Sequence, residues 1–390
     1  MGLVLMSNHQ TSISLICLVG ICVVIAGFLL KKIHQPNLVA YIIIGIIIGD
    51  GGFQLIADKE MLTFIGELGI ILLFFFLGME INLDIFVKEW KLALFGTTGQ
   101  ILLSVASVYI IGSWFDWSFA RILVIGFVIA LSSSAVIFKI LEEMDLYDTK
   151  IGQNVSSILL SQDIAIAPIL IAITIIGGES LSFASIMLKI AGGVMIISII
   201  AYIYVKKEIK WIPFKKSISQ DHELQVFMAI FYCFAGALIA GLFGISEALG
   251  AFVGGLIMHA SKATEWIHDA IHSFRILFVA IFFIAIGAQI DLTFISIHWI
   301  QITTVLCAVY LTNHLINACI LRLYGNQWKA AIYGGALLAQ IGELSFLIAL
   351  TALQSGILSD YAYDFSICLI SLTICISPLY ILVCKRLLKL

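Results

Sequence analysis

The chain has 390 residues, of which 62% are hydrophobic and only 12% are charged, and its formal net charge is -3. Soluble domains carry about a quarter charged residues, so this composition excludes an ordinary soluble protein and predicts a surface that faces lipid. In lipid the backbone must satisfy its own polar groups, which leaves helices or closed barrels. The apolar runs are about 20 residues long and do not alternate with a period of two, and this favours helices.

We therefore expect an all-α polytopic membrane protein with about 13 transmembrane helices. The first apolar run is long enough to span and no basic n-region precedes it, so we do not expect a cleavable signal peptide. In chain order, the expected spans are 12–31, 38–50, 62–80, 91–113, 121–141, 152–177, 183–205, 223–243, 245–260, 273–290, 298–322, 329–355 and 364–385.

The basic residues predict the orientation. With the N-terminus outside, all 21 Lys and Arg residues except Lys59, Arg121 and Lys189 belong to the cytoplasmic side. Cytoplasmic loops are enriched in Lys and Arg, so this distribution favours an N-terminus outside and a C-terminus inside. We expect a multi-pass protein of the cell (inner) membrane.

The domain organisation predicted for residues 1–390 is a single transmembrane domain. The longest loop, 206–222, is basic and lies midway along the chain, so it divides the spans into two sets. We interpret these sets as inverted pseudo-repeats over about 12–205 and 223–385, joined by a cytoplasmic loop.

Each half contains a polar break rich in small residues, ALSSSAV at 130–136 and AQIGELS at 339–345. Interrupted helices in corresponding positions of two halves indicate a transporter site at the repeat interface. The alternative is that Ser and Gly only let helices pack closely. Two such breaks and a buried acid together favour a site.

The acid is Asp163, in the apolar stretch SSILLSQDIAIAPIL, with Gln162 before it and Pro168 five residues after it. An ionisable side chain inside the bilayer is costly, so it is a functional hypothesis by default. Burial disfavours the charged form, and the carboxylate can then hold either a proton or a small cation. Pro168 removes a backbone donor and can free a carbonyl near the acid. The alternative is a fixed ion pair with a buried base.

The two breaks offer further oxygen atoms. Ser132, Ser133 and Ser134 supply hydroxyls and, where the helix opens, carbonyl oxygens of the kind that hard cations prefer. Glu343, with Gln340 nearby, could bind an ion, carry a proton or neutralise the dipoles of helix ends, and we favour the last role.

Four more polar residues have no role that the sequence assigns. Glu67 and Glu247 stand near the expected outer boundary and read as interface residues, and Lys189 could snorkel outward or pair with an acid. His314 could sense pH, although a hydrogen-bonded packing histidine is the favoured reading.

Enzymatic chemistry is not predicted. The chain has no GxSxG, Walker A, HExxH or GxGxxG motif, and its eight cysteines form no CxxC pair. We expect no enzyme activity, no cofactor and no nucleic-acid partner, and transport would draw on an ion gradient.

The order and spacing of several segments resemble the monovalent cation/proton antiporters of the second cation:proton antiporter branch, and within it the Kef-type potassium/proton antiporters. The likeness runs from about residue 38 to residue 385. The segments are AYIIIGIIIGDGGF at 40–53, ELGIILLFFFLGMEINLD at 67–84, ALSSSAVIFKILEE at 130–143, LLSQDIAIAPIL at 159–170, ISEALGAFVGGLIMHAS at 245–261, FFIAIGAQIDL at 282–292 and LLAQIGELSF at 337–346.

This resemblance implies a core domain and a dimerisation domain, with two unwound helices that cross near the acid. It also implies elevator-like alternating access in a homodimer. The motif acid of the family maps to Asp163, which would hold the monovalent cation, K⁺ or Na⁺. Kef-type members have Gln before that acid, so Gln162 looks like a potassium preference.

Two departures from the family pattern matter. Many relatives have a lysine in the eleventh span, and by spacing Asn313 stands at that position. The missing lysine predicts one-for-one, electroneutral exchange. Kef-type proteins usually continue into a nucleotide-binding regulatory domain, whereas this sequence stops soon after the last expected span. We therefore expect no such domain here, and regulation by a separate subunit is compatible with that.

Other readings stay open at this point. The nearest is a sodium/proton antiporter of the same fold. A sodium-coupled organic solute transporter would need a basic pocket, and the core spans have no arginine. A channel or a non-transporting sensor is a further class.

Overall fold

The computed structural model describes residues 8–32, 37–49, 52–53, 55, 59–80, 90–177, 183–206, 221–261 and 264–389. All regular structure in these ranges is helical. The elements are α1 (Asn8–Lys32), α2 (Asn37–Ile48), α3 (Lys59–Glu80), the π-helical turn η1 (Leu92–Gly96), α5 (Thr97–Trp114), α6 (Phe119–Ala130), α7 (Ser134–Glu143), α8 (Lys150–Ile176), α9 (Phe183–Lys206), α11 (His222–Leu242), α12 (Glu247–Ala260), α13 (Thr264–Ala288), α14 (Leu292–Leu323), α15 (Trp328–Leu337), α16 (Leu344–Gln354) and α17 (Asp360–Leu388).

The expected all-α architecture is confirmed. Each expected span falls on one helix or on two helices separated by a short break. Within the described ranges, five helices are long and apolar enough to cross a membrane, and others are apolar but shorter. The total of about 13 crossings therefore stays a prediction. Most of the expected loop 206–222 lies outside the described residues.

Two helices differ from their expected bounds. α13 begins at Thr264, ahead of the expected start at residue 273. α14 begins at Leu292 and bends at His298, where φ is -107° and ψ is 18°. The expected span 298–322 therefore corresponds to the part of α14 that follows the bend.

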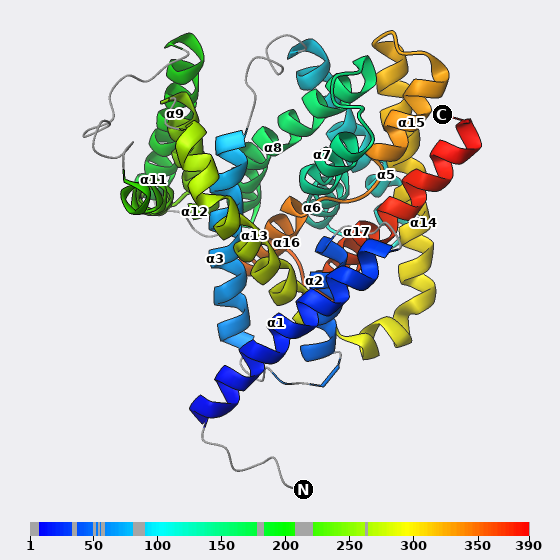
Figure 1. Ribbon diagram of the computed structural model, residues 1–390. Helices are drawn as coiled ribbons and strands as arrows, with labels where there is room; N and C mark the ends of the chain where they lie inside the picture. Colours follow the sequence, from blue (N-terminus) through cyan, green and yellow to red (C-terminus); the bar gives the residue numbers. More distant parts are fainter. Residues whose placement is uncertain are drawn as a thin grey trace, which may run out of the picture.

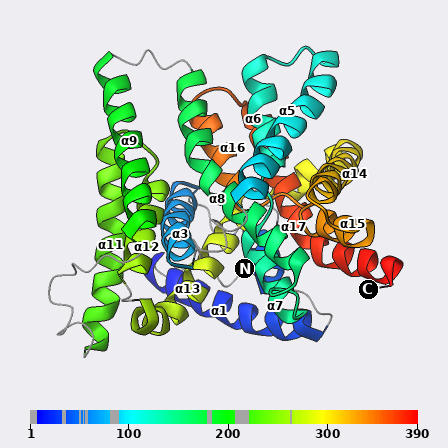
Figure 2. The ribbon, with the colours of Figure 1, turned by 90° about the horizontal axis from the view of Figure 1, so that it is seen from above.

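The helices pack in two groups that lie side by side (Figures 1 and 2). The first group contains α1, α2, α3, α11, α12 and α13, and α9 packs against α12. The second contains η1, α5 to α8 and α14 to α17. Each half of the chain contributes helices to both groups, so the groups are interleaved in sequence.

Small residues bring helices of the first group close together. A Cβ atom at Gly78 of α3 would lie 2.1 Å from the carbonyl oxygen of Phe252 in α12. In the opposite direction, a Cβ atom at Gly255 of α12 would lie 2.1 Å from the carbonyl oxygen of Phe75 in α3. Only glycine fits at these contacts, and close backbone approach is how helices associate in lipid.

The second group surrounds α16, which packs against α6, α8 and α17 (Figure 2). α8 begins at Lys150 because the Thr149 side chain caps it and accepts a hydrogen bond from the Gly152 N–H at 3.1 Å. The helix then runs unbroken past Asp163 to Ile176, and this fixes the acid beside the broken helices.

Candidate functional site

Two interrupted helices cross in the middle of the second group. α6 ends at Ala130 and α7 begins at Ser134, while α15 ends at Leu337 and α16 begins at Leu344. The connecting segments, 131–133 and 338–343, are not helical. The Gly342 N–H donates a hydrogen bond of 2.7 Å to the Leu131 carbonyl, so the segments meet backbone to backbone. Both expected breaks, and the crossing implied by the resemblance, are present.

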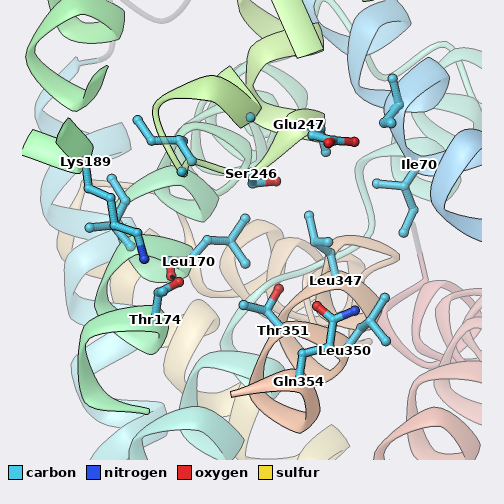
Figure 3. Close-up of a pocket in the computed structure, with 16 residues that line it drawn as sticks. Ile70, Leu170, Thr174, Lys189, Ser246, Glu247, Leu347, Leu350, Thr351 and Gln354 are labelled. Atoms are coloured by element: carbon cyan, nitrogen blue, oxygen red, sulfur yellow. Dashed lines mark hydrogen bonds between the residues drawn. The ribbon is translucent and has the colours of Figure 1, made fainter. Parts of the chain in front are cut away.

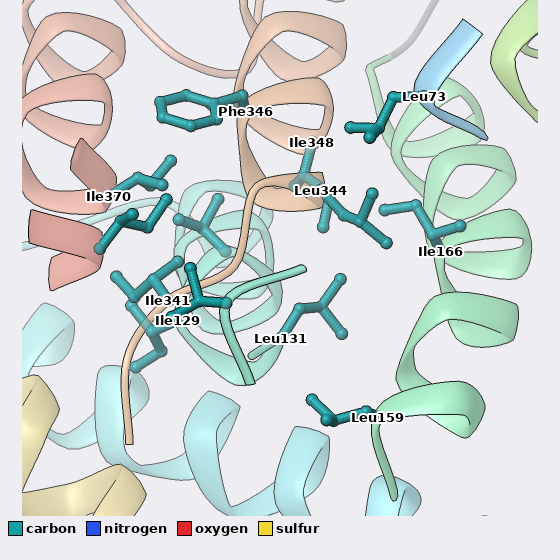
Figure 4. Close-up of a cluster of buried hydrophobic side chains, with 14 of the residues drawn as sticks. Leu73, Ile129, Leu131, Leu159, Ile166, Ile341, Leu344, Phe346, Ile348 and Ile370 are labelled. Carbon is teal, nitrogen blue, oxygen red and sulfur yellow. The ribbon is translucent and has the colours of Figure 1, made fainter. Parts of the chain in front are cut away.

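Apolar side chains enclose the crossing (Figure 4). Leu131 and Ile341 project from the two segments, and both are at most 1% exposed. Leu159 and Ile166 of α8 line the same cluster, as does Leu344 at the start of α16. Because water is kept out, each polar group at the crossing needs a partner in the protein or a bound ion.

Asn313 ties the two segments together. Its Nδ2 atom donates to the Ile129 carbonyl at 2.7 Å and to the Ala339 carbonyl at 3.3 Å. Its Oδ1 atom accepts from Gln100 Nε2 at 3.2 Å. The side chain is fully buried. Asn313 therefore lies at the crossing, and its amide satisfies backbone groups that the broken helices leave unpaired.

Gln162 performs a similar task from α8. Its Oε1 atom accepts from the Ser132 N–H at 2.9 Å, and its Nε2 atom donates to the Ala130 carbonyl at 3.2 Å. Both ends of the amide are thus bound to the backbone of the first break. The oxygen keeps a second lone pair that could face a cation.

The Gln162 contacts predict a large loss of stability in Gln162→Leu. Two buried backbone groups would lose their partners, and this costs about 2–4 kcal/mol in the free energy of unfolding. Thermal unfolding in detergent measures the effect. Gln153→Leu, at a half-buried position on the same helix, is the matched control. An unchanged melting temperature in Gln162→Leu would contradict this structural role.

Glu343 gathers the serines of the first break. Ser133 Oγ donates to Glu343 Oε2 at 2.5 Å, and Ser134 Oγ donates to Glu343 Oε1 at 3.2 Å. The carboxylate therefore stands where α7 and α16 both begin, and helix N-termini favour negative charge. This geometry supports a role for Glu343 in neutralising helix-end dipoles. Ser132 differs, because its Oγ donates to the Leu338 carbonyl at 2.8 Å.

Asp163 is the buried acid that lacks hydrogen bonds. Its side chain is 2% exposed, and neither carboxylate oxygen has a hydrogen-bond partner. The nearby groups that influence its charge are the Glu343 carboxylate, which repels a second negative charge, and the Ser134 hydroxyl, which donates to Glu343 and could donate to Asp163 instead. No basic side chain is among these neighbours in the described part of the chain, which argues against a fixed ion pair. A buried carboxylate beside a second acid is unfavourable when ionised, so it requires a proton or a bound cation.

Gln340 and Pro168 complete the predicted set. The Gln340 amide is fully buried, and neither its oxygen nor its nitrogen has a hydrogen-bond partner. Pro168 lies within α8 and is exposed, so the helix continues through it. A proline there cannot donate to the carbonyl of Ile164, the residue after Asp163. Gln340 therefore leaves buried polar atoms at the crossing that could face an ion, and Pro168 leaves the Ile164 carbonyl without its helical donor.

A separate cavity of about 420 Å³ lies between the two groups (Figure 3). Lys189 and Glu247 both line it, and the Lys189 ammonium points towards Thr174 (Figure 3). Neither residue belongs to the crossing. The Glu67 side chain, the other acid predicted near this boundary, lies outside what the structure describes.

His314 joins three helices of the second group. Its Nδ1 atom lies 2.5 Å from the Tyr380 hydroxyl of α17, and its ring stands against Gly335 of α15. These contacts support the reading of His314 as a hydrogen-bonded packing residue. The described residues contain no group of three or more His, Cys, Asp or Glu side chains that could hold a metal ion.

Sequence reasoning missed several supporting residues. Gln100 holds Asn313, the Asn317 amide donates to the Leu338 carbonyl at 3.3 Å, and Ser345 Oγ donates to the Val128 carbonyl at 2.7 Å. Asn317 had a signal, because it stands one helical turn after Asn313 on the same face. Gln100 is a lone amide in an apolar run, and its sequence gives no indication of its partner.

Comparison with known families agrees with this geometry. The family model described as the transmembrane domain of sodium/hydrogen exchangers matches residues 18–382. The chain belongs to this family. The chain is therefore a multi-pass membrane protein of a cation/proton antiporter family, and its relatives are transporters, not enzymes.

Among curated relatives, the chain is 29% identical to the iron transporter MagA of Paramagnetospirillum magneticum, over 98% of this chain and 87% of that one. It is 26% identical to the glutathione-regulated potassium-efflux system protein KefC of Enterobacter sp., over 91% of this chain and 58% of that one. It is 22% identical to a Na⁺/H⁺ antiporter of Enterococcus hirae, over 94% and 96% of the two chains.

A solved structure shows the fold. The sodium proton antiporter MjNhaP1 of Methanocaldococcus jannaschii superimposes with a TM-score of 0.66 at 14% identity, covering 97% of this chain and 100% of that chain. The chain spans less than two thirds of the length of the KefC relative.

Proposed function

We propose that this protein exchanges potassium ions for protons, with Asp163 holding the two in turn. The observation that carries the proposal is the Asp163 carboxylate, which is buried, has neither oxygen in hydrogen-bonding geometry with a partner, and lies beside a second acid and no basic group among the described residues. Such a group is stable only when a proton or a cation neutralises it. Competition between them at one carboxylate couples the two fluxes.

The choice of potassium as the cation rests on Gln162 and on one of the relatives. Gln162 precedes the acid, as in Kef-type antiporters, and a KefC protein is among the relatives. In this chain the Gln162 amide is bound to the backbone, so only the second lone pair of its oxygen is free for an ion. Gln340, whose buried amide has no partner, is the other neutral ligand of the proposed site.

A cation series tests the proposal. The purified protein is reconstituted into liposomes with an internal pH dye, and pulses of potassium, sodium, lithium and rubidium are applied to an imposed pH gradient. We expect potassium and rubidium to dissipate the gradient at lower concentration than sodium. A sodium half-saturation far below that of potassium would favour the sodium/proton antiporter instead. Ferrous iron, added to the same liposomes under anaerobic conditions, tests for the iron transport named for the MagA relative.

Exchange is expected to be electroneutral. Asn313 stands at the position of the lysine found in many relatives. Its amide is hydrogen-bonded to both breaks and to Gln100, and an amide does not take up or release a proton as a lysine does. One proton should therefore exchange for one monovalent cation at Asp163. In the same liposomes, a membrane potential imposed with a thiocyanate gradient should leave the initial exchange rate unchanged. A rate that changes with the sign of this potential would contradict one-for-one exchange.

The remaining expectations belong to the same proposal. We infer that the second group of helices moves as the core domain in an elevator-like cycle and that the first group forms the homodimer. We also propose that the protein lies in the cell membrane with its N-terminus outside. Its two halves would be inverted pseudo-repeats, and a separate subunit would regulate it. Cross-linking of cysteines introduced between the groups tests the movement, because a locked protein should bind ions but not exchange them.

The other transport classes give distinct outcomes. Single-channel currents would indicate a channel, whereas silent recordings together with pH flux support an exchanger. Sodium-driven uptake of an organic acid without proton flux would indicate a solute transporter.

A further inference from the structure

One end of the second group carries an exposed aromatic and basic surface. Trp90 and Lys91 directly precede η1, Arg322 lies in the last turn of α14, and Trp328 and Lys329 begin α15. All five side chains are exposed, and Trp90 and Trp328 keep 47% and 56% of their surface. We call these five residues the collar. The positive-inside rule assigns them to the cytoplasmic side.

One hydrogen bond between segments far apart in sequence and several local contacts hold the collar in place. The Tyr324 hydroxyl donates to the Lys91 carbonyl at 3.1 Å. Arg322 Nη1 donates to the Asn326 carbonyl at 3.1 Å, and its guanidinium lies 5.5 Å from the centre of the Trp328 ring. The Lys91 ammonium lies 5.9 Å from the Trp90 ring. Two of the three basic groups, Lys91 and Arg322, are therefore arranged before any ligand binds.

Apolar side chains adjoin the collar. Leu94 and Phe95, in η1, are 49% and 59% exposed, and the Phe95 ring lies 6.4 Å from that of Trp90. Leu323, next to Arg322, is 84% exposed. Cationic groups, aromatic rings and an aliphatic surface thus occur together at the end of membrane helices, where Trp and Tyr favour the headgroup level.

Within the described segments that form the collar the charges are of one sign, although Glu89, next to Trp90 in sequence, lies outside the described residues. Residues 90–98 and 320–330 contain no acidic residue. Two described acids, Asp145 and Asp148, lie in the turn before α8, and Lys150 begins that helix. The start of α8 reaches the α14–α15 connection through the hydrogen bond from Asn154 Nδ2 to Asn326 Oδ1, at 3.2 Å. Lys150 does not belong to the collar, because the charges of Asp145 and Asp148 balance its own.

We propose that the collar binds the headgroup of an anionic phospholipid, with the acyl chains along Leu94, Phe95 and Leu323. Basic residues at a membrane surface attract anionic lipid. A soluble acidic protein would match the charges but not the adjoining exposed aliphatic surface. The match to both parts of one lipid molecule favours the lipid.

A lipid at the collar would contact elements tied to the crossing. η1 follows Lys91 without a break, and beyond it Thr97 Oγ1 donates to the Ile158 carbonyl of α8 at 3.3 Å. One turn further along α5, Gln100 holds Asn313. The collar is thus joined to both α8 and the crossing through described hydrogen bonds.

Lipid binding is tested without reference to transport. The full chain, delipidated in a neutral detergent, is titrated with phosphatidylglycerol, phosphatidylcholine or soluble glycerol phosphate, and its melting temperature is recorded. We expect phosphatidylglycerol to raise the melting temperature by several degrees and the other two to leave it unchanged. The triple variant Lys91→Gln, Arg322→Gln, Lys329→Gln should weaken phosphatidylglycerol binding at least about tenfold.

The matched control removes three basic residues at the end of α17, through Lys385→Gln, Arg386→Gln and Lys389→Gln. It should keep the response of the wild type. Equal losses in both triple variants, or an undiminished response in the collar variant, would overturn the proposal. Equal stabilisation by glycerol phosphate would indicate a site for a free phosphate group. A wild type that responds to none of the three compounds would indicate a protein as the partner. Either result overturns the lipid assignment.

Discussion

Asp163→Asn is expected to abolish exchange while leaving the fold intact. Asparagine has nearly the shape of aspartate, but it can neither carry a proton nor neutralise a cation. The initial rate of potassium-dependent proton flux should fall by about a hundredfold or more, as for loss of a group that acts directly on the transported ions. The liposome assay with the internal pH dye measures this rate.

Stability separates this prediction from simple misfolding. Neither Asp163 oxygen makes a hydrogen bond that the substitution would break, and asparagine is neutral in the buried site without a proton or a cation. The melting temperature of Asp163→Asn should therefore equal or exceed that of the wild type. Asp148→Asn, at an exposed carboxylate in the turn before α8, is the control and should retain exchange. Full exchange in Asp163→Asn would refute the proposed mechanism.

Gly342→Ala is expected to disrupt the crossing. A Cβ atom at this position would lie 2.6 Å from both the carbonyl carbon and the carbonyl oxygen of Ser132, and 2.8 Å from the Ser133 nitrogen. These are backbone atoms, so no side-chain rotation relieves the overlap. The cost in free energy of unfolding should reach about 3 kcal/mol, the upper part of the range for overpacked positions.

Exchange should fall together with stability in Gly342→Ala, because the Gly342 N–H to Leu131 hydrogen bond joins the two broken helices. Gly99→Ala serves as the control. A Cβ atom at Gly99 of α5 would meet only the end of the Ile320 side chain, at 3.8 Å, and alanine favours the helix. A Gly342→Ala protein that unfolds at the wild-type temperature and exchanges normally would contradict this prediction, because it would show that the two broken helices need not approach so closely.

Gln162 shows where reasoning from one sequence ends. Its place beside the acid predicts an ion ligand, whereas the structure adds that both ends of its amide bind the first break. Such a break leaves backbone groups unpaired in a region without water, and a neighbouring amide is the ready partner. The sequence contains the amide and the break, but it does not indicate that one serves the other.

Asn313 illustrates the same limit. By family spacing it replaces a lysine, and this suggested only an absent charge. In the structure its amide bridges carbonyls of both unwound segments. Lys189 and Glu247, which the sequence left unassigned, line a cavity between the two helix groups and stand apart from the crossing.

The sequence by itself determined the helical membrane class, the two breaks and Asp163 as the central acid. These features depend on composition and on the cost of a charge or an open backbone in lipid, which each segment shows locally. Only the tertiary structure decided how the polar groups pair. The deciding hydrogen bonds join residues 30 positions apart at Gln162 and Ser132 and 213 positions apart at Gln100 and Asn313. Such pairings arise from the way the helices pack, because any buried amide can satisfy any backbone group that the fold brings within reach.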